Sequence, residues 1–530
     1  MEKRDANKAN IYLVGSGIAS LASAVYLVKD AGVEGNRIHV MEQRDIAGGA
    51  LDGSGEESEG YLIRGGRMHE DHYVCYWDLL SHIPSLEDPE VSVTDECKAF
   101  NVKYVSNARA RLMRAGEIMD VSSYGLSKGD QAAMLKLWFA PEIILGDKRI
   151  EDWFSEHFFE TNFWLLWTSM FAFQKWSSLA EMRRYFIRFI HLLPGMNRLE
   201  KILRTKYNQY DSVVLPLRRW LEDKGVQFEM RHQVIDIEFD PAADSKRARV
   251  IHYLVEGEEK QIMLDEEDCV FITNGSIVES ADTGSMDAPP VLYGKAESGA
   301  WKLWEKIAAQ HEDFGNPGVF CNNVDLQKWE SFTITLRDSV FHDHMEKFTG
   351  NVSGTGGLVT FTDSNWLMSI VIAAQPHFAN QPDEVKVFWG YGLYPDREGN
   401  HVKKKMSECS GREILEELWH HLKIADLMQP VVDAGKVICL PVMMPFIDSL
   451  FMPRKPGDRP RVLPDGARNF AFLGQFAEVP HDCVFTVEYS VRCAQMAVYG
   501  LFDTGKKPLP IYQGHHDPVV LANAVQALNR

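Results

Sequence analysis

The sequence predicts an α/β fold that begins with a strand, a helix and a second strand. Residues 11–14 (IYLV) and residues 38–41 (IHVM) are short apolar runs typical of buried strands. Between them, small and apolar residues such as Ala22 and Val25 follow a glycine-rich turn, which favours a helix. Glu42 comes directly after the second strand. This order of elements, with a carboxylate at the end of the second strand, is typical of a Rossmann-type dinucleotide-binding domain.

The turn between the first strand and the helix reads GxGxxS. Gly15 permits the tight turn, and Gly17 lets backbone N–H groups approach a pyrophosphate at the N-terminus of the helix. Ser20 stands in place of a third glycine and is small enough for close packing of helix on strand. Glu42 is placed to accept hydrogen bonds from a ribose hydroxyl group. The residues of this unit expected to bind a dinucleotide are Gly15, Gly17, Ile18, Ala19, Ser20, Glu42 and Gln43.

Two glycine pairs follow this unit. Five residues separate Glu42 from Gly48-Gly49, and residues 64–67 read RGGR. The E-x5-GG run resembles that of FAD-binding two-domain oxidoreductases, in which the second glycine pair runs under the flavin phosphates. The resemblance implies FAD as the cofactor, while NAD, or a βαβ unit that binds no cofactor, stays open as an alternative. It implies further cofactor contacts from Gly49, Arg64, Gly66, Arg67, Val234, Asn274, Gly275, Ser276, Gly474, Gln475, Val484 and Phe485.

Length and composition exclude several classes of protein. At 530 residues the chain is too long for one simple domain, and we expect two or three. The net charge of −19 argues against a nucleic acid partner, because a phosphate backbone needs a basic face. The eight cysteines are scattered without a CxxC pair and the N-terminus is not a secretory signal, so we expect reduced thiols and a cytoplasmic location. No apolar run is long enough to span a membrane, and the 18 histidines show no HExxH or similar cluster, so no metal site is expected.

The rest of the chain divides into helical and β segments. Helices are expected at 69–80, over much of the aromatic stretch 128–203, in the first part of 205–230 and at 481–501. Strands are expected at 100–118, 226–240, 268–276, in parts of 318–400 and at 469–476. The Pro- and Met-rich stretch 438–454 reads as a loop against a hydrophobic cavity. His420 and His421 read as a solvated helix face rather than as metal ligands.

A series of colinear motifs resembles the oleate hydratase family, also called myosin-cross-reactive antigens, over nearly the whole chain. The motifs are GSGIASL, RGGR followed by Glu70, His72 and Trp77, NFWLLWTSMFAFQKW, EMRRYFIRFIH, TKYNQY, FITNGS, DSNW, QPHF, MMPFIDSLFMPR and GQFAEVPHDCVFTVEYSVR. The resemblance implies an FAD-dependent enzyme that adds water to the cis-9 double bond of free unsaturated fatty acids, such as oleic acid, and gives 10-hydroxy fatty acids. The resemblance further implies a reaction without net redox change, in which FAD shapes and polarises the site and reduced FAD is the more active form.

The resemblance also implies a domain plan. A Rossmann-type FAD-binding domain of the two-domain flavoprotein kind is expected from three separated segments, with an inserted substrate domain and a helical lid. The expected segments are 1–127, 205–290 and 441–530 for the FAD-binding domain, 128–204 for the helical lid and 291–440 for the substrate domain.

Hydration of an unactivated alkene needs a proton donor on one face and a water molecule on the other. The resemblance implies that Tyr185 in EMRRYFIRF is the proton donor and that Gln209 in TKYNQY helps to set the polar geometry. The family pattern has glutamate directly after RGGR, where this chain has Met68, and a thioether has no useful basicity. His69 and Glu70 are the nearest substitutes, although Glu70 also suits a structural hydrogen bond. The flavin with an ordered water is the remaining alternative.

The chain departs from the family pattern a second time near the substrate head group. The family binds the fatty acid carboxylate with a threonine and an asparagine before QPHF, and Val371 and Ala373 occupy those positions here. Neither side chain forms hydrogen bonds, and a buried carboxylate without partners is unfavourable by several kcal/mol. The head group is therefore bound elsewhere, held by backbone N–H groups, or chemically different. Gln375 and His377 complete the expected substrate-binding residues.

Two other functions stay open on these departures. A flavin-dependent fatty acid isomerase or dehydrogenase would use the same fold, and a lipid-binding flavoprotein without turnover would lack both missing groups. The expected partners are a free unsaturated fatty acid and water, with weak peripheral membrane contact as a further alternative. Many family members have extended termini that help them to dimerise, and these look trimmed in this chain. We therefore expect a monomer or a weak homodimer.

Overall fold

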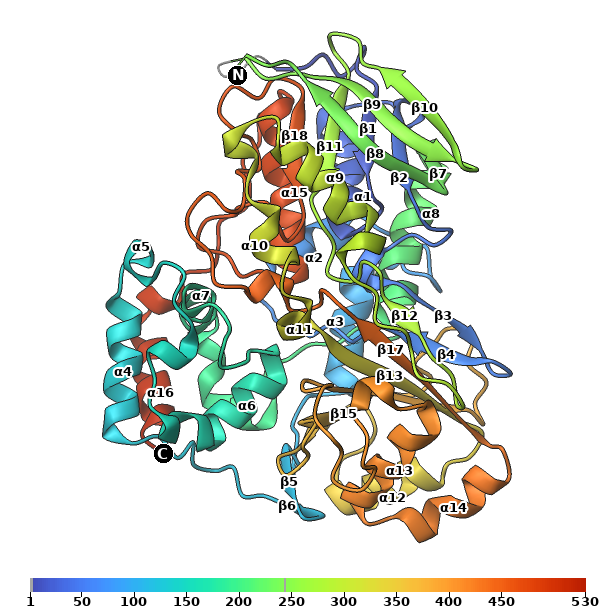
Figure 1. Ribbon diagram of the computed structural model, residues 1–530, viewed down its shortest axis with the longest axis vertical. Helices are drawn as coiled ribbons and strands as arrows, with labels where there is room; N and C mark the ends of the chain where they lie inside the picture. Colours follow the sequence, from blue (N-terminus) through green and yellow to red (C-terminus); the bar gives the residue numbers. More distant parts are fainter. Residues whose placement is uncertain (1–2, 243–244) are drawn as a thin grey trace.

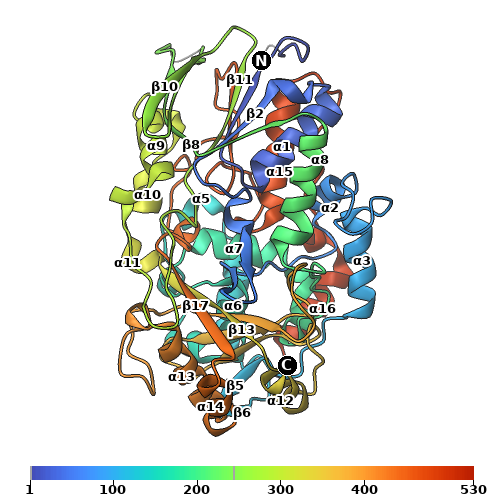
Figure 2. The ribbon, with the colours of Figure 1, turned by 90° about the vertical axis from the view of Figure 1, so that its right-hand side faces the viewer.

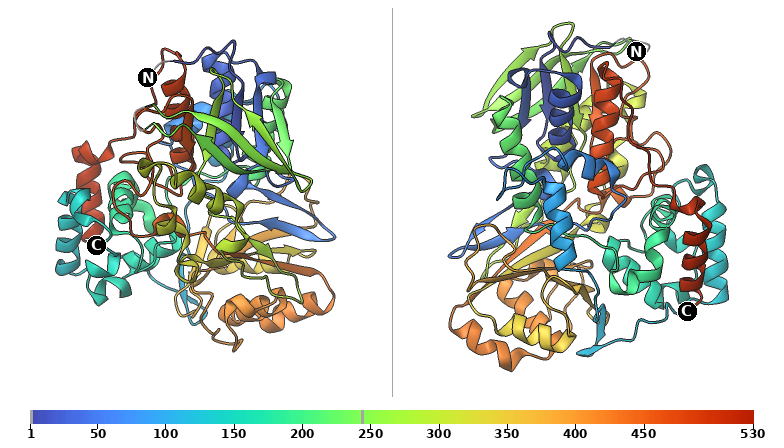
Figure 3. Two further views of the ribbon diagram at one scale, coloured as in Figure 1. Left: turned by 45° about the horizontal axis from the view of Figure 1, so that its top comes forward. Right: turned by 180° about the vertical axis from the view of Figure 1, so that it is seen from behind.

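The computed structural model describes residues 3–242 and 245–530. Figure 1 shows a parallel sheet with its helices at one end of the molecule and a larger sheet with helices α12–α14 at the other. A third group of helices, which includes α4, α6 and α16, lies beside them. The two further views in Figure 3 show the same three regions, with the C-terminus in the helical one.

The parallel sheet confirms the Rossmann-type fold. Its strand order is β18-β11-β1-β2-β7, and every neighbouring pair is parallel. The strands are β1 (Ile11–Val14), β2 (Ile38–Glu42), β7 (Gln227–Met230), β11 (Cys269–Thr273) and β18 (Phe470–Leu473). They come from distant parts of the chain, as an α/β sheet interrupted by inserted domains requires.

Helices and a second, antiparallel sheet cover the two faces of the parallel sheet. Helices α1 (Ile18–Tyr26), α8 (Leu215–Asp223) and α15 (Val487–Leu501) lie on one side in Figure 2. The other side carries α9 (Gly299–Ala308) and the sheet of β8 (His232–Phe239), β9 (Ala248–Val255) and β10 (Glu258–Met263). Burial on both faces explains the apolar runs of β1 and β11.

The larger sheet has eight strands in the order β12-β17-β13-β16-β15-β14-β5-β6. The strands are β12 (Asp282–Thr283), β17 (Val437–Met444), β13 (Trp329–Leu336), β16 (Lys386–Gly392), β15 (Met368–Ile372), β14 (Gly357–Phe361), β5 (Leu112–Arg114) and β6 (Glu117–Ile118). Three helices cover one face: α12 (Val340–Thr349), α13 (Gly411–Leu422) and α14 (Ala425–Asp433). The sheet therefore also takes strands from outside residues 291–440.

Alternation along these strands decides which side chains face the centre of the molecule. Ile370 and Phe388 belong to the apolar cluster under α12–α14, whereas their neighbours Val371 and Trp389 belong to the central core. Because successive side chains of a strand point to opposite faces, one strand serves both cores. Val371 and Trp389 pair across β15 and β16 and form part of the central surface.

The helical region contains α4 (Lys128–Phe139), α5 (Glu142–Leu145), α6 (Asn162–Phe171), α7 (Leu179–Arg188), a 3₁₀ segment (Ile190–Arg198) and the C-terminal α16 (Pro518–Leu528). Figure 1 places α16 beside α4. The hydroxyls of Ser127, Thr161 and Ser178 accept backbone N–H bonds at the starts of α4, α6 and α7. These N-caps satisfy donors that a helix start leaves free.

Three local expectations were wrong. The stretch expected as strands from residue 100 begins inside α3 (Val93–Lys103), which Ser92 caps by accepting the Asp95 N–H, so only β5 and β6 are strands there. The stretch 438–454 begins in β17, which ends at Met444, and only its second part, residues 445–454, is a turn and loop segment with a short 3₁₀ helix. His421 is buried and not solvated, with Nε2 3.2 Å from the Glu417 carboxylate.

The remaining elements are β3 (Gly53–Glu56), β4 (Gly60–Ile63), α2 (Val74–Leu80), α10 (Pro317–Cys321) and α11 (Val324–Gln327). All eight cysteines are buried and none forms a disulfide in the described part of the chain. Across residues 3–242 and 245–530, no helix has both the length and the apolar content needed to cross a membrane.

Candidate active site

A first cavity lies at the carboxyl ends of β1, β2 and β11, against the N-terminus of α1. Its empty volume is about 1230 Å³, which includes solvent at its mouth. The carboxyl edge of an open parallel sheet is the usual place for a ligand in this fold. The predicted residues that line it are Gly15, Gly17, Ile18, Ala19, Glu42, Gln43, Gly49, Arg67, Val234, Asn274, Gly275, Ser276, Gly474, Gln475 and Phe485.

The glycine-rich turn has the geometry that its sequence requires. Gly15 has a φ of +86°, a conformation that side chains disfavour. Gly17 precedes α1, and a Cβ atom placed on it would meet no protein atom within 4 Å. A Cβ on Gly49 would lie 3.3 Å from the Gly17 Cα, so the first glycine pair packs directly on the turn. The helix N-terminus therefore opens into the cavity without a side chain in front of it.

Glu42 is held by the same turn. Its carboxylate accepts hydrogen bonds from the Ser16 N–H at 2.9 Å, from the Ser16 hydroxyl at 2.5 Å and from the Arg44 N–H at 2.9 Å. A carboxylate has about four acceptor sites, so capacity remains for a ligand hydroxyl group. The position of Glu42 thus agrees with the expected ribose contact, but it also stabilises the turn.

Asn274 gives the clearest sign that the first cavity holds a polar ligand. Both polar atoms of its side-chain amide are buried and have no hydrogen-bond partner in the protein. Leaving such a group unsatisfied is unfavourable by about 1–3 kcal/mol. The open helix N-terminus and this unpartnered amide fit a dinucleotide.

Four predicted cofactor residues do not line the first cavity. Ser20 lies in the first turn of α1, on the side that faces β11, with its hydroxyl 3.2 Å from that of Thr273, so it serves packing. The Arg64 Nε donates to Asp52 at 2.9 Å, and Gly66 lines the other two cavities described below. The carbonyl oxygen of Val484 instead accepts a hydrogen bond from the Tyr185 hydroxyl. Sequence reasoning missed Thr486, which lines the cavity and caps α15; a threonine before a helical run was the available signal.

A second cavity adjoins the first, and the two share Arg67, Phe485, Thr486 and Val487. Its empty volume is about 790 Å³. Its walls are Gly65, Gly66, Arg67, Met68, Tyr73, Ser169, Met170, Phe171, Ala172, Tyr185, Phe189, Trp329, Leu358, Val371, Trp389, Tyr391, Phe485, Thr486 and Val487. No aspartate, glutamate or histidine is among these residues. The predicted residues Tyr185 and Met68 meet in this mostly apolar space.

Tyr185 is fixed in the second cavity by one hydrogen bond and by aromatic packing. Its hydroxyl donates to the Val484 carbonyl oxygen at 2.5 Å. The rings of Phe171, Phe173 and Phe189 surround it, with centroids 4.9–5.4 Å away. Burial raises the pKa of Tyr185 well above its usual value of 10, so the side chain is a protonated donor at neutral pH.

His69 does not line any of the three cavities, in contrast to its expected role beside Met68. Its ring stacks on Tyr76 at 4.7 Å, and burial lowers the pKa of His69 to about 3. The cause is a backbone pairing, because the His69 N–H donates to Leu203 and the Leu203 N–H donates back. This pairing turns residue 69 away from the side that Met68 faces.

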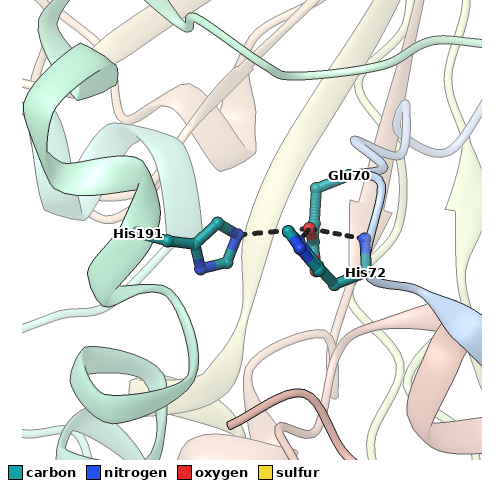
Figure 4. Close-up of side chains that lie close together, drawn as sticks. All are labelled: Glu70, His72 and His191. Atoms are coloured by element: carbon teal, nitrogen blue, oxygen red, sulfur yellow. Dashed lines mark hydrogen bonds and ion pairs between the residues drawn. The ribbon is translucent and has the colours of Figure 1, made fainter. Parts of the chain in front are cut away.

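Glu70 also lies outside the cavities, in a buried ion-pair network shown in part in Figure 4. Its carboxylate lies 3.0 Å from Arg188 Nη1, 2.9 Å from His72 Nδ1 and 3.2 Å from His191 Nε2. Burial by itself raises the pKa of Glu70, but the bonds from His191, His72 and Arg188 hold it well below the usual range. Glu70 therefore anchors the segment after RGGR to α7 and does not replace the missing glutamate.

Glu70, His72 and His191 also meet the distance criterion for a metal site, since their ligand atoms lie within 4.8 Å of one another. However, Arg188 already pairs with this carboxylate, and the ring of Tyr512 stacks on His72 at 3.6 Å. A cation would compete with the guanidinium for the same charge. We therefore interpret the cluster as structural.

A third cavity adjoins the second, and the two share Gly66, Arg67, Val371 and Trp389. Its empty volume is about 410 Å³, and the predicted Gln209, Val371, Ala373 and His377 line it. The Gln209 amide donates to the Gly65 carbonyl oxygen at 2.6 Å and accepts from the Arg67 N–H at 3.3 Å. Gln209 thus holds the second glycine pair in place. Gln375 does not line the cavity, because its amide bonds to Val387 at 2.8 and 3.0 Å.

The chain is similar to known proteins both in sequence and in fold. A family model described as the MCRA family matches residues 8–499. The chain is 43% identical to an oleate hydratase of Streptococcus pyogenes serotype M49 (strain NZ131), over 95% of this chain and 87% of that protein. It is 32% identical to a linoleate hydratase of Lactiplantibacillus plantarum, over 93% of each chain. The solved structure of cyclohexylamine oxidase from Brevibacterium oxydans IH-35A aligns with a TM-score of 0.51 at 13% identity, over 96% of this chain and 100% of that one, which shows a shared fold.

Proposed function

The chain belongs to the MCRA family, and from this premise we propose that it is an FAD-dependent fatty acid hydratase. The names of the two hydratase relatives support this proposal. The main structural support is the position of Tyr185, which lines the mostly apolar second cavity directly beside the first cavity. Such a cavity suits the hydrocarbon chain of a fatty acid, and its one deeply placed phenol suits proton donation.

The first cavity fits FAD. The N-terminus of α1 would face the pyrophosphate, Glu42 the ribose, and Asn274 a polar group of the cofactor. Arg67 and Phe485, which line the first and second cavities, would lie at the flavin end, with the guanidinium 5.3 Å from the ring centroid. When bound, FAD supplies a polarised wall to the second cavity.

In the proposed reaction, Tyr185 gives its proton to C9 of a cis-9 fatty acid. The oxygen of a water molecule bonds to C10, and the proton which that water releases restores the tyrosine. The sum is the addition of one water, which gives a 10-hydroxy fatty acid without redox change. Met68 offers no base, so the water attacks a centre that already carries positive charge, for which a weak nucleophile is sufficient.

The experiment is an incubation of the full chain with oleate and FAD in H₂¹⁸O, with and without a reductant, read by mass spectrometry. We expect a product heavier than oleate by one labelled water, formed faster when the flavin is reduced. An unchanged mass with a moved double bond would indicate an isomerase, and a loss of two hydrogens a dehydrogenase. Bound lipid and bound FAD without any product would indicate a lipid-binding flavoprotein.

A further inference from the structure

The third cavity is cationic and contains no acidic side chain. The basic residues of its lining are Arg67, Arg204 and Lys206. Two of its cations have partners elsewhere: Lys206 pairs with Glu87, and Arg67 donates to the carbonyl oxygen of Ala50. The third cation, Arg204, has no such partner for its guanidinium among the described residues.

Arg204 is held in a defined position by its backbone. The Arg204 N–H donates to the Asn101 side-chain oxygen at 2.9 Å, and the Asn101 amide donates back to the Arg204 carbonyl oxygen at 2.7 Å. The preceding residue, Leu203, pairs with His69, the residue after Met68. The same pairing therefore places Met68 at the second cavity and Arg204 at the third.

The guanidinium of Arg204 has no hydrogen bond or ion pair with any residue that the structure describes, and its Nη2 atom is fully covered. Room for it depends on Gly357, because a Cβ atom there would lie 2.6 Å from Nη2. Burial lowers the pKa of Arg204 to about 10, and no carboxylate offsets this effect. The side chain as a whole is half-buried, so a partly desolvated guanidinium without an anion lies at this cavity and is suited to an anionic ligand.

The positions that bind the head group in the family pattern offer little hydrogen bonding here. Val371 and Ala373 line the cavity with apolar groups only, and the Nε2 atom of His377 is buried without a partner. Oxygen atoms of the lining side chains come from Thr205, Tyr207 and Gln209, and each already bonds to another group: Gln209 to the Arg67 N–H, Thr205 to the Tyr207 carbonyl oxygen and Tyr207 to Glu87. None of them bonds to the Arg204 guanidinium or to Nε2 of His377. A carboxylate would supply the acceptors.

We propose that Arg204 binds the carboxylate of the fatty acid in the third cavity and so determines the preference of this protein for free acids. The inference rests on the proposed function and names the head-group partner that the side chains of Val371 and Ala373 do not provide. The head group would lie in the third cavity, and the hydrocarbon chain would pass Gly66 and Trp389 into the second cavity, where Tyr185 lies. A planar guanidinium can form two parallel bonds to a carboxylate.

The test compares equilibrium binding of oleate with that of oleyl alcohol, which has the same chain and double bond but no charge. Binding to the full chain with FAD is measured by calorimetry, without reference to turnover. Wild type is expected to bind oleate more tightly than the alcohol. In Arg204→Met, the Kd for oleate is expected to rise roughly 30-fold or more, while that for the alcohol changes by less than about threefold. Arg204→Lys, which keeps the charge but not the planar fork, is expected to lie between them.

Lys206→Met is the matched control, since Lys206 lines the same cavity but already pairs with Glu87. It should leave the acid-to-alcohol ratio within about twofold of wild type. An Arg204→Met protein that keeps its preference for the acid would overturn the inference, whatever its turnover. A wild-type protein that binds oleate no more tightly than oleyl alcohol would also overturn the inference. This measurement needs no variant, so the inference can be tested even if Arg204→Met does not fold. The two proposals can also fail separately. If wild type prefers the acid and Arg204→Met loses that preference, but wild type forms no hydrated product, then the hydratase proposal is wrong and the head-group site is still supported.

Discussion

The hydroxyl of Tyr185 donates a hydrogen bond to the carbonyl oxygen of Val484 at 2.5 Å. Tyr185 belongs to α7 in the helical region, whereas Val484 precedes α15, which packs on the parallel sheet. The bond therefore joins two regions of the molecule at the wall of the second cavity. A phenol held in this way keeps one orientation toward a substrate, which general acid catalysis requires.

Tyr185→Phe should remove the proton donor with little change in packing. We expect kcat for oleate hydration to fall by about 10²-fold or more, because general acid catalysis contributes about 10²–10⁴-fold. The Val484 carbonyl loses one partner, so the free energy of unfolding should fall by only about 1–3 kcal/mol. Oleate affinity and FAD content, measured on the same preparation, should stay near wild type. A variant that keeps most of its activity would exclude Tyr185 as the acid.

Met68→Glu should place a base in the second cavity and make the rate dependent on pH. The ionisable residues that line it have pKa values of about 10 for Arg67, about 12 for Tyr391 and well above 10 for Tyr73 and Tyr185. Wild-type kcat should therefore be flat between about pH 5 and 9. The variant should gain an acidic limb and exceed wild type by about 10-fold or more once the new carboxyl is ionised.

Met68→Gln is the control for that experiment, since it has a similar size and cannot ionise. Its pH profile should be flat and its rate should not rise. If Met68→Glu is no faster than Met68→Gln at any pH, position 68 does not face the attacking water.

Glu70→Gln should destabilise the fold in a pH-dependent way. The change leaves Arg188 without its nearest anion, although Asp482 remains 3.8 Å away, so we expect a loss of about 3 kcal/mol. The pKa of Glu70 is lower in the folded chain than in the unfolded chain, where it is about 4.3. Its contribution is therefore complete above about pH 5 and declines as pH falls below about 4.3. Urea unfolding of both proteins between pH 3 and 7 measures this difference, and a gap that does not narrow in acid would contradict the assignment.

Gly17→Ala should impair FAD binding without harming the fold. Its φ is −68° and its Cβ would point into open space, so neither strain nor overlap arises within the protein. The methyl group would instead occupy the approach to the N-terminus of α1, and we expect the FAD Kd to rise about 10-fold or more. Gly129→Ala, at an exposed position in α4, is the control and should bind FAD normally. Equal FAD affinity in both variants would place the cofactor elsewhere.

Much of the parallel-sheet region could be predicted from local signals. The strands β1, β2, β11 and β18 coincide with apolar runs, and the turn at Gly15 needs a residue that tolerates positive φ. These signals are short in range, since periodicity and turn chemistry act within a few residues. The resemblance of motifs then extended the prediction to the cavity residues around Asn274 and Gly474.

Local signals failed where the outcome depended on pairing between distant segments. Residues 438–444 have the composition of a loop but belong to β17, because β13 pairs with that strand along its whole length. Ser20 has the predicted packing role, against Thr273 of β11, but it does not line the first cavity, where a cofactor contact was expected. In both cases a neighbour far away in the sequence decided the role.

The βαβ unit, the glycine turns and the family can all be recognised from residue types and their spacing along the chain. Only the tertiary structure decided which of three consecutive residues faces the reaction. Met68 lines the second cavity and His69 does not, since the pairing of His69 with Leu203 turns these two side chains to opposite sides. Glu70 is held outside the cavities by Arg188, His72 and His191. The same pairing brings Arg204 to the third cavity without a charged partner. Charge balance in a buried site depends on what the fold brings near it, and that cannot be read from one segment alone.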